Sequence, residues 1–86
     1  MYETINERVD CVAIFGTNFH DLKPYRIKWR NKVHNIDEVG YKHKVREGNK
    51  ILHIFSCTSG SNFFELTFDA NDIKWILART WDNEVN

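Results

Sequence analysis

The stretch ILHIFSCTSGSNFFELTFDANDIKWILARTW, residues 51–81, decides the fold class. Three apolar runs, ILHIFSC, FFELTF and IKWILARTW, are separated by the turn-forming segments TSGSN and DAND. The last run has the length of a short helix, but its apolar residues recur with the period of two that is typical of a strand. Those residues are Ile73, Trp75, Leu77 and Trp81. This part of the chain therefore predicts three successive antiparallel strands joined by short turns.

Two further strands are indicated upstream of this stretch. In RVDCVAIFG, residues 8–16, apolar and β-branched residues form a run that ends at Gly16. The next segment, TNFHDLKP, carries Asn18 and Pro24 and is therefore expected to form a turn. In YRIKWRNKV, residues 25–33, apolar residues occupy odd positions and cations occupy even ones. This alternation predicts a strand with one apolar face and one cationic face.

The segment from Val33 to Val45 predicts a strand whose alternation is interrupted. Ile36 breaks the period of two, and the period resumes further along the chain. Because one extra residue reverses the alternation, we expect a β-bulge or bend between Asp37 and Gly40. The following REGNK is expected to be a hairpin loop, since its Gly-Asn pair tolerates positive φ.

These elements together predict an all-β protein. The chain of 86 residues, of which 42% are hydrophobic, suffices for one modest core and leaves no room for a second domain. We expect a single domain over residues 1–86, with its ordered core at about residues 8–82. Its architecture is predicted to be an antiparallel meander of about five to six strands, curled into a small barrel or a strongly twisted sheet.

The sequence also indicates a cellular compartment. It contains no run of about 18 apolar residues that would span a membrane, and its N-terminus is too polar for a signal peptide. We therefore expect a cytoplasmic protein. Cys11 and Cys57 are far apart in the chain and lack CxxC spacing, so they are expected to be buried free thiols rather than a disulfide.

One motif pattern resembles a known family. The hairpin YRIKWRNKVHNIDEV, the strand FFELTFD and the terminal WILARTWD follow each other in this order. The order is similar to a family of small bacterial domains of unknown function, in which a hairpin F-x-W-x-G/N-x-x-Y-x-V precedes W-x-L-x-R-x-W. The resemblance covers residues 9–82, and the chain departs from it at His34, where the family has an aromatic residue. It implies an association with proteins that resemble Y-family DNA polymerases, and it supplies no catalytic residue.

The charge of the chain is divided unevenly along the sequence, although the formal net charge is zero. Residues 22–50 hold nine Lys or Arg against three acidic residues, whereas the remainder holds three against nine. A cationic face of this kind can neutralise phosphates by releasing counterions. The candidate nucleic-acid-binding residues are Arg26, Lys28, Arg30, Lys32, Lys42 and Lys44.

The aromatic residues favour a different interpretation of the same segment. Tyr25, Trp29 and Tyr41 alternate with the cations, so they are expected to point into the core while the cations point to water. The three tryptophans are expected to be core residues for the same reason. Trp81, near the end of the chain, is the best candidate for an exposed aromatic that binds a partner.

The sequence offers no catalytic or metal-binding constellation. It lacks HExxH, GxSxG and a glycine-rich phosphate loop. His53 and Cys57 lie four residues apart and Cys11 could approach from a neighbouring strand, but buried cysteines and hydrogen-bonded histidines are common in cores. We therefore expect neither a metal, nor a cofactor, nor enzymatic activity.

The sequence thus favours a binding module without enzymatic activity. Its preferred partner is another protein, and a second copy of the chain is one candidate, because the acidic remainder can complement the basic segment between two copies. The alternative is an accessory domain that binds nucleic acid through the phosphate backbone, with the basic hairpin face as its surface.

Overall fold

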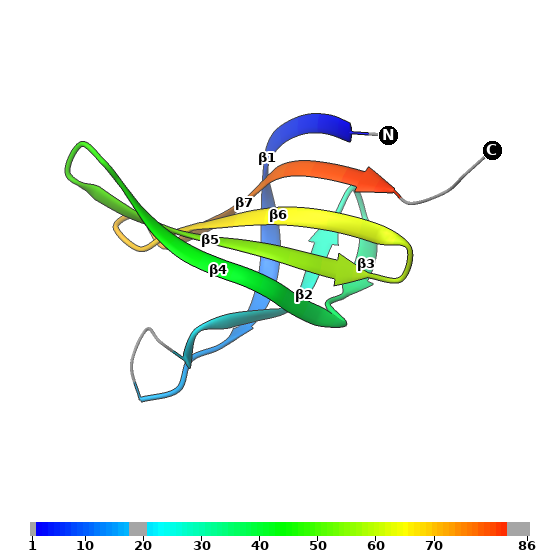
Figure 1. The fold of residues 1–86 in the computed structure, drawn as a ribbon, viewed down its shortest axis with the longest axis horizontal. Helices are drawn as coiled ribbons and strands as arrows, with labels where there is room; N and C mark the ends of the chain where they lie inside the picture. The colour runs from blue at the N-terminus through cyan, green and yellow to red at the C-terminus, as the bar shows by residue number, and fades with distance from the viewer. Residues whose placement is uncertain (1, 18–20, 83–86) are drawn as a thin grey trace.

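The computed structural model describes residues 2–17 and 21–82 and confirms the all-β class (Figure 1). The turn predicted at Asn18 lies outside the described residues. Seven strands form within the described ranges: β1 (Tyr2–Ile14), β2 (Lys23–Trp29), β3 (Lys32–Asn35), β4 (Glu38–Glu47), β5 (Lys50–Ser59), β6 (Asn62–Asp69) and β7 (Lys74–Asp82). A search of the same residues for a helix that could cross a membrane finds none.

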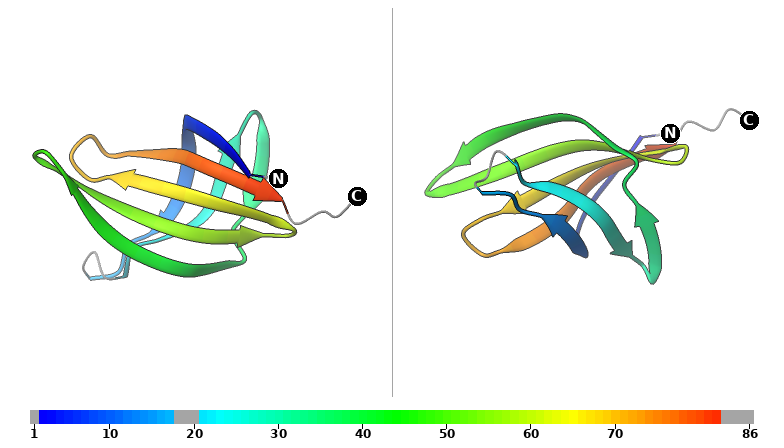
Figure 2. Two further views of the ribbon diagram at one scale, coloured as in Figure 1. Left: turned by 45° about the horizontal axis from the view of Figure 1, so that its top comes forward. Right: turned by 90° about the horizontal axis from the view of Figure 1, so that it is seen from below.

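All seven described strands belong to one antiparallel sheet with the order β3-β2-β1-β7-β6-β5-β4. The sheet curls into a half-barrel, in which β4 to β7 form one wall and β1 to β3 form the other (Figures 1 and 2). The two walls meet where β3 ends. There Ser59 Oγ donates to the carbonyl oxygen of Asn35 at 2.6 Å, and Asp37 N donates to the carbonyl oxygen of Thr58 at 2.8 Å. These bonds hold the sheet curled.

The number of strands exceeds the predicted five to six because the third predicted strand is divided in two. The strand ladder is interrupted at Ile36 and Asp37, and Ile36 N donates to the carbonyl oxygen of Tyr25 at 2.9 Å. The predicted bulge is confirmed, since the register between β4 and β5 shifts between Val39 and Tyr41. Strand β1 also begins at Tyr2, earlier than the predicted start of the core.

The hairpin turns follow the local chemistry of their residues. Gly48 and Gly60 have φ of 62° and 60°, as the first residue of a type II′ turn requires. The turn between β2 and β3 places Arg30 and Asn31 at φ of 52° and 63°, the pattern of a type I′ turn. The hairpin predicted at the Gly-Asn pair is therefore confirmed, with positive φ at Gly48 alone.

The inner side of the curled sheet holds the hydrophobic core. Paired residues on adjacent strands point to the same side, so Phe55, Leu66 and Leu77 form one continuous row. The buried hydrophobic residues are Val9, Leu22, Ile27, Phe55, Cys57, Phe64, Leu66, Phe68, Trp75 and Leu77. Cys57 is a buried free thiol as predicted, and Cys11 is a half-buried one. Burial raises the pKa of both thiols to about 12.

The three tryptophans lie in three different environments. Trp75 is a core residue as predicted, and Trp29 is half-buried against the core. Trp81 differs because Ala78 is an extra residue in β7, between Leu77 and Arg79, which reverses the alternation of side chains. Trp81 therefore lies on the outer side of the sheet, opposite Phe63.

Candidate functional site

The outer side of β4 to β7 carries an unusual number of apolar side chains. Tyr41 is exposed, and the others are half-buried although no other layer covers them in the described chain. We call this surface the apolar outer face, and its residues are Tyr41, Leu52, Ile54, Phe63, Ile76 and Trp81. The four strands that carry it lie side by side at the front of the molecule (Figure 2, left). A surface of this kind is typical of a site where a partner binds.

One end of the apolar outer face is hollowed beside two stacked aromatic rings. The rings of Phe63 and Trp81 stack with centroids 5.3 Å apart and planes at 12°. Together with Tyr41 and Ser56 they line a hollow of about 240 Å³. Gly40 lines the same hollow, and a Cβ at this position would meet no atom nearer than Ser56 O, at 3.8 Å. The hollow is therefore suited to an apolar side chain.

A single charged pair lies at the middle of this face. Arg79 Nη2 donates to Glu65 Oε1 at 2.6 Å, and Arg79 Nε donates to Glu65 Oε2 at 3.0 Å. The two residues are direct cross-strand partners in β6 and β7. Because both bonds join the same two groups, the guanidinium is held in a fixed orientation. The face thus presents one fixed cation and one fixed anion among apolar residues.

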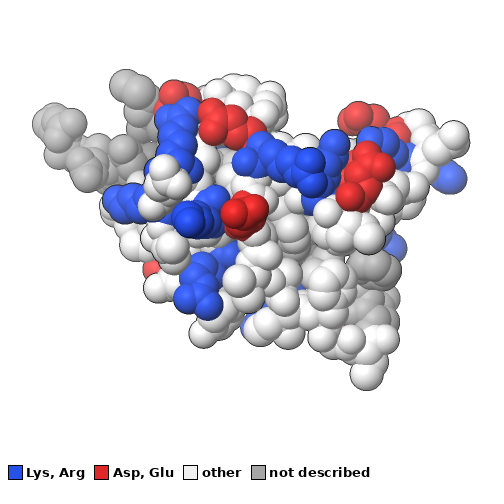
Figure 3. All heavy atoms as spheres, turned by 180° about the vertical axis from the view of Figure 1, so that it is seen from behind, with Lys and Arg blue, Asp and Glu red and all other residues white. Residues whose placement is uncertain are grey.

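The outer side of β1 and β2 mixes charged and apolar side chains, since Val12 and Ile14 of β1 are 51% and 44% exposed there. Arg26 and Lys28 are exposed there, and Asp10 lies opposite Lys28 in the register. Viewed from behind, the molecule shows Lys and Arg side chains interspersed with Asp and Glu (Figure 3). This wall therefore carries a mixed-charge surface.

The six predicted nucleic-acid-binding residues do not form one surface. Arg26 and Lys28 point outward from β2, whereas three others lie on the inner side of the sheet because their cross-strand partners point inward. Those three are Lys32, opposite Trp29, and Lys42 and Lys44, opposite Phe55 and His53. The strand order, which a sequence pattern does not reveal, separates β2 from β4 by four intervening strands.

Arg30 also departs from the predicted cationic face because it belongs to the β2–β3 turn. Its guanidinium donates to Glu7 Oε2 at 2.7 Å and lies 4.6 Å from the ring centroid of Trp29. Trp29 Nε1 donates to the other oxygen of Glu7 at 3.0 Å. Hydrogen bonds from Arg30 and Trp29 lower the pKa of Glu7. Arg30 therefore ties the turn to β1.

Lys42 is engaged with the core of its own molecule. Its ammonium donates to the carbonyl oxygen of Leu22 at 3.1 Å and lies 5.9 Å from the ring centroid of Phe55. These contacts connect β4 with the segment that precedes β2.

The prediction that Tyr25 and Tyr41 face the core is wrong. Their exposed fractions are 52% and 61%. Tyr25 is the extra residue in β2 between the pairs formed by Pro24 and Arg26, so a bulge turns it away from the core. Tyr41 follows the bulge at Gly40 in the same way. The guanidinium of Arg26 lies 5.9 Å from the ring centroid of Tyr25.

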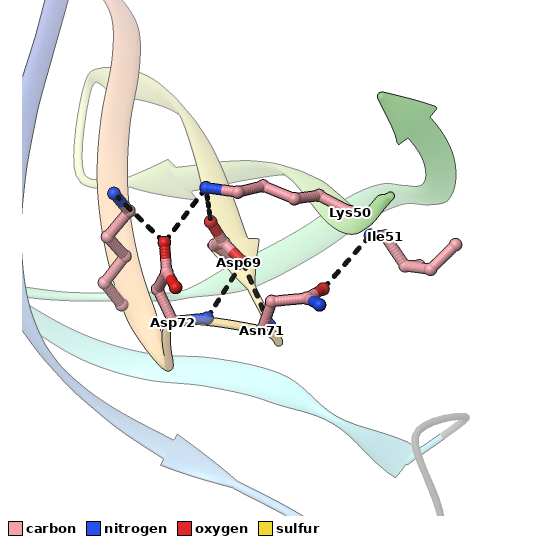
Figure 4. A network of polar contacts seen from close by, with 6 residues as sticks. Lys50, Ile51, Asp69, Asn71 and Asp72 are labelled. Carbon is pink, nitrogen blue, oxygen red and sulfur yellow. Dashed lines mark hydrogen bonds and ion pairs between the residues drawn. The ribbon is translucent and has the colours of Figure 1, made fainter. Parts of the chain in front are cut away.

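The carboxylates of the β6–β7 turn have a structural role. Asp69 Oδ1 accepts hydrogen bonds from Asn71 N at 2.9 Å and Asp72 N at 3.1 Å (Figure 4). Lys50 Nζ binds Asp69 at 3.1 Å and Asp72 at 2.9 Å, and Lys74 Nζ lies 3.8 Å from Asp72. Burial acts to raise the pKa of Asp69, but these hydrogen bonds outweigh it and hold that pKa below its usual value.

The described histidines are placed as packing residues. His34 packs its ring 5.1 Å from Phe64 and 6.2 Å from Trp29, so it fills the position of an aromatic residue. Burial lowers the pKa of His34 and of the buried His53. Within residues 2–17 and 21–82, no three His, Cys, Asp or Glu residues gather into a group that could hold a metal ion.

A comparison of the chain with protein-family models, curated proteins and solved structures finds no match. The resemblance to small bacterial domains, and the association with polymerase-like proteins that it implies, therefore stay predictions.

Among the residues of the apolar outer face, Trp81 was predicted from the sequence as a candidate for binding, and the others were not. The sequence indicated these residues only by the nearly continuous apolar runs ILHIF and FF at the starts of β5 and β6. A strand with one solvent-exposed side alternates apolar and polar residues more regularly. The single extra residue at Ala78, which brings Trp81 next to Phe63, left no mark in the sequence pattern.

Proposed function

We propose that this protein is a self-assembling binding module, without enzymatic activity or a cofactor, whose apolar outer face packs against the same face of a second copy. The observation that carries the proposal is the contrast between the two outer sides of one sheet. The β4 to β7 side is largely apolar and includes a stacked aromatic pair, whereas the β1 and β2 side mixes charged residues with Val12 and Ile14. Two such faces packed together would remove the half-exposed Ile54, Ile76 and Trp81 from water, which is the main favourable term in association.

The charges of the face favour a second copy over an unrelated partner. A two-fold axis through the middle of the face brings Glu65 of one copy toward Arg79 of the other, and the reverse. Each Glu65–Arg79 pair thereby meets the opposite charges of the same pair in the other copy. This match requires no other charged residue. The face is self-complementary in charge as well as in apolar character.

The size of the face suits a reversible dimer. Four strands about 4.8 Å apart and about eight residues long cover roughly 500 Å² as a flat area. Stable interfaces bury about 800 Å² of accessible surface on each partner, and side chains that project from a face add to its flat area. We therefore expect a monomer–dimer equilibrium that responds to protein concentration.

Sedimentation velocity over a range of protein concentrations tests the dimer. Ile54→Lys places a charge in the middle of the face and is expected to leave a monomer at every concentration, because the charge would be buried without a partner. Val33→Lys is the matched control, since Val33 is 52% exposed on β3 of the other wall, and it is expected to dimerise as the unchanged protein does. A sedimentation coefficient of a monomer for the unchanged protein at all concentrations would refute the proposal.

Binding of single-stranded nucleic acid is the second candidate function. It is favoured by the exposed ring of Tyr25, which offers a stacking platform beside Arg26 and Lys28. Fluorescence anisotropy with labelled DNA and RNA at about 50 and about 200 mM salt tests it, with the double variant Arg26→Ala, Lys28→Ala as the comparison. Binding that falls steeply with salt and with the two substitutions would support this function, and no binding at the lower salt would exclude it.

A further inference from the structure

Strand β4 presents a long open edge at one end of the described sheet. It is the last strand in the sheet order, and its segment from Lys42 to Glu47 pairs with β5 on one side alone. The opposite edge strand, β3, has four residues, and its end is held by the hydrogen bond between Ser59 and Asn35. An open edge of this length can accept an additional strand.

The β4–β5 turn determines which residues of β4 present their backbone groups to this edge. The pair Glu47 and Lys50 flanks a two-residue turn and is therefore a hydrogen-bonded pair. Hydrogen-bonded and non-hydrogen-bonded pairs alternate along an antiparallel ladder. The N–H and C=O groups of Lys42, Lys44 and Arg46 consequently point away from β5, toward the open edge.

The side chains along the edge differ between its two sides. Lys44 and Arg46 are exposed on the inner side, whereas the outer side carries Tyr41, His43 and Val45. The rings of Tyr41 and His43 lie 5.0 Å apart. The Nδ1 atom of His43 is buried and has no hydrogen-bond partner among the described residues. An added strand would therefore meet cations on one side and aromatic or apolar groups on the other.

We propose that the β4 edge binds an extended segment of another protein in which acidic and apolar residues alternate, so that this segment becomes an additional strand of the sheet. Successive side chains of a strand point to opposite sides, so the acidic residues would face Lys44 and Arg46 while the apolar residues would face Tyr41 and Val45. The backbone bonds would supply affinity, and the alternating charges would supply selectivity.

A second copy of β4 does not fit this edge. Antiparallel pairing of two copies brings the cations of Lys42, Lys44 and Arg46 close to the same cations of the other strand, and such contacts are destabilising. Lysine and arginine at an edge oppose aggregation in the same way. The proposed site thus goes beyond the dimer, which uses the apolar outer face.

Anisotropy with a labelled ten-residue peptide of alternating Glu and Val tests the proposal. Two control peptides are used: one has the same composition with all Glu residues placed before the Val residues, and one has Lys in place of Glu. The alternating Glu peptide is expected to bind at least about tenfold tighter than either control, because it alone places every acid on the side of the cations. Equal binding of the alternating and the block peptide would overturn the proposal.

Charge reversal locates the site on β4. The double variant Lys44→Glu, Arg46→Glu is expected to lose the Glu peptide and to bind the Lys peptide instead. The matched control is Arg26→Glu, Lys28→Glu on the outer side of β2, and its affinity for the Glu peptide is expected to stay unchanged. The same loss in both variants would overturn the proposal, because the peptide would then respond to overall charge.

Backbone pairing is tested with Lys44→Pro against Lys44→Ala. Both remove the ammonium, but Pro also removes an N–H that points to the open edge and leaves the ladder with β5 intact. The Pro variant is expected to bind the peptide at least about fivefold more weakly than the Ala variant. If circular dichroism shows that the Pro variant is unfolded, a peptide N-methylated at alternate residues takes its place and is expected to lose binding. Equal affinities in either comparison would overturn the proposal.

Two further measurements separate this site from the other proposals. The Ile54→Lys variant is expected to bind the peptide normally even where it fails to dimerise, since Ile54 lies on β5, one strand inward from the edge and opposite His43. Single-stranded DNA of the same number of charges is expected to compete poorly with the peptide. Competition by this DNA at equal concentration would overturn the proposal.

Discussion

The two walls of this half-barrel share one core and differ on their outer sides. Strands β1 to β3 and β4 to β7 send residues into the same inner cluster, for example Ile27 from β2 and Leu66 from β6. Outside, the first wall mixes charged residues with exposed apolar ones such as Val12, whereas the second carries Ile54, Ile76 and Trp81. The inner core requires only one apolar side of each strand. The second apolar side of β4 to β7 lies outside this core, and this contrast supports the proposal that the surface serves binding.

The largest expected effect tests whether the two walls depend equally on the shared core. Leu66→Ala in one wall and Ile27→Ala in the other each empty a site with no exposed area, and each is expected to lower the free energy of unfolding by about 2–5 kcal/mol. Urea denaturation followed by tryptophan fluorescence measures both. A loss in one variant and none in the other would show that the walls are stabilised separately.

A smaller effect, an increase in stability, is expected at the β6–β7 turn, with the β2–β3 turn of the other wall as its control. Ile73, in the β6–β7 turn, is β-branched with φ of 53°, and its side chain is 75% exposed. Ile73→Asn is expected to raise the free energy of unfolding by about 1 kcal/mol, because Asn tolerates this conformation. Thermal denaturation measures the change. Asn31→Gly in the β2–β3 turn, at φ of 63°, is the control and is expected to change stability by less than about 0.5 kcal/mol. A decrease for Ile73→Asn would show that the Ile73 side chain contributes contacts that outweigh the strain.

The smallest expected effect is a dependence of the free energy of unfolding on pH, which compares His53 of one wall with His34 of the other. Burial and the charges of Lys44 and Lys42 lower the pKa of His53 in β5, and burial and Lys32 lower that of His34 in β3. On acidification the unfolded chain therefore binds protons before the folded chain does. The corresponding stability is present above about pH 6.5 and is lost as the pH falls through this value toward the folded pKa.

Denaturation at about pH 7 and about pH 5 measures this loss. His53→Phe and His34→Phe each remove one titrating group and keep a ring in place, so each is expected to reduce the dependence on pH. An unchanged dependence in both variants would assign the loss of stability to other groups, among them Asp69, whose lowered pKa acts at more acidic pH.

Local patterns in the sequence predicted much of the fold. The period of two in the segment from residue 51 onward, the turn residues Gly48 and Gly60, and the bulge near Gly40 all follow from chemistry within a few residues. The order of the strands does not, because the pairing of β1 with β7 joins segments far apart in the chain. The extra strand arose where the ladder is interrupted at Ile36 and Asp37, and Asp37 N there donates to Thr58 O of the other wall.

The candidate sites were less accessible to prediction because each depends on a bulge or on strand register. Extra residues at Tyr25 and Ala78 turned Tyr25 and Trp81 outward, although simple alternation placed both in the core. Register placed Arg26 on the outer side of the sheet and Lys44 on the inner side, although they belong to one basic segment. The concentration of Lys and Arg in residues 22–50 is visible in the sequence itself. Part of this charge is neutralised within the fold, because Glu7 and Asp69 form ion pairs with Arg30 and Lys50.

The pairing of β1 with β7 also has a consequence for synthesis. Strand β1 is made first, yet its partner on one side, in which Trp81 lies opposite Tyr2, is made last among the described strands. During translation β1 can pair with β2, but its other edge stays without a partner until β7 leaves the ribosome. The final folding step thus unites the two most distant strands of the described chain, and a nascent chain that stalls before β7 exposes a long strand that is open to aggregation.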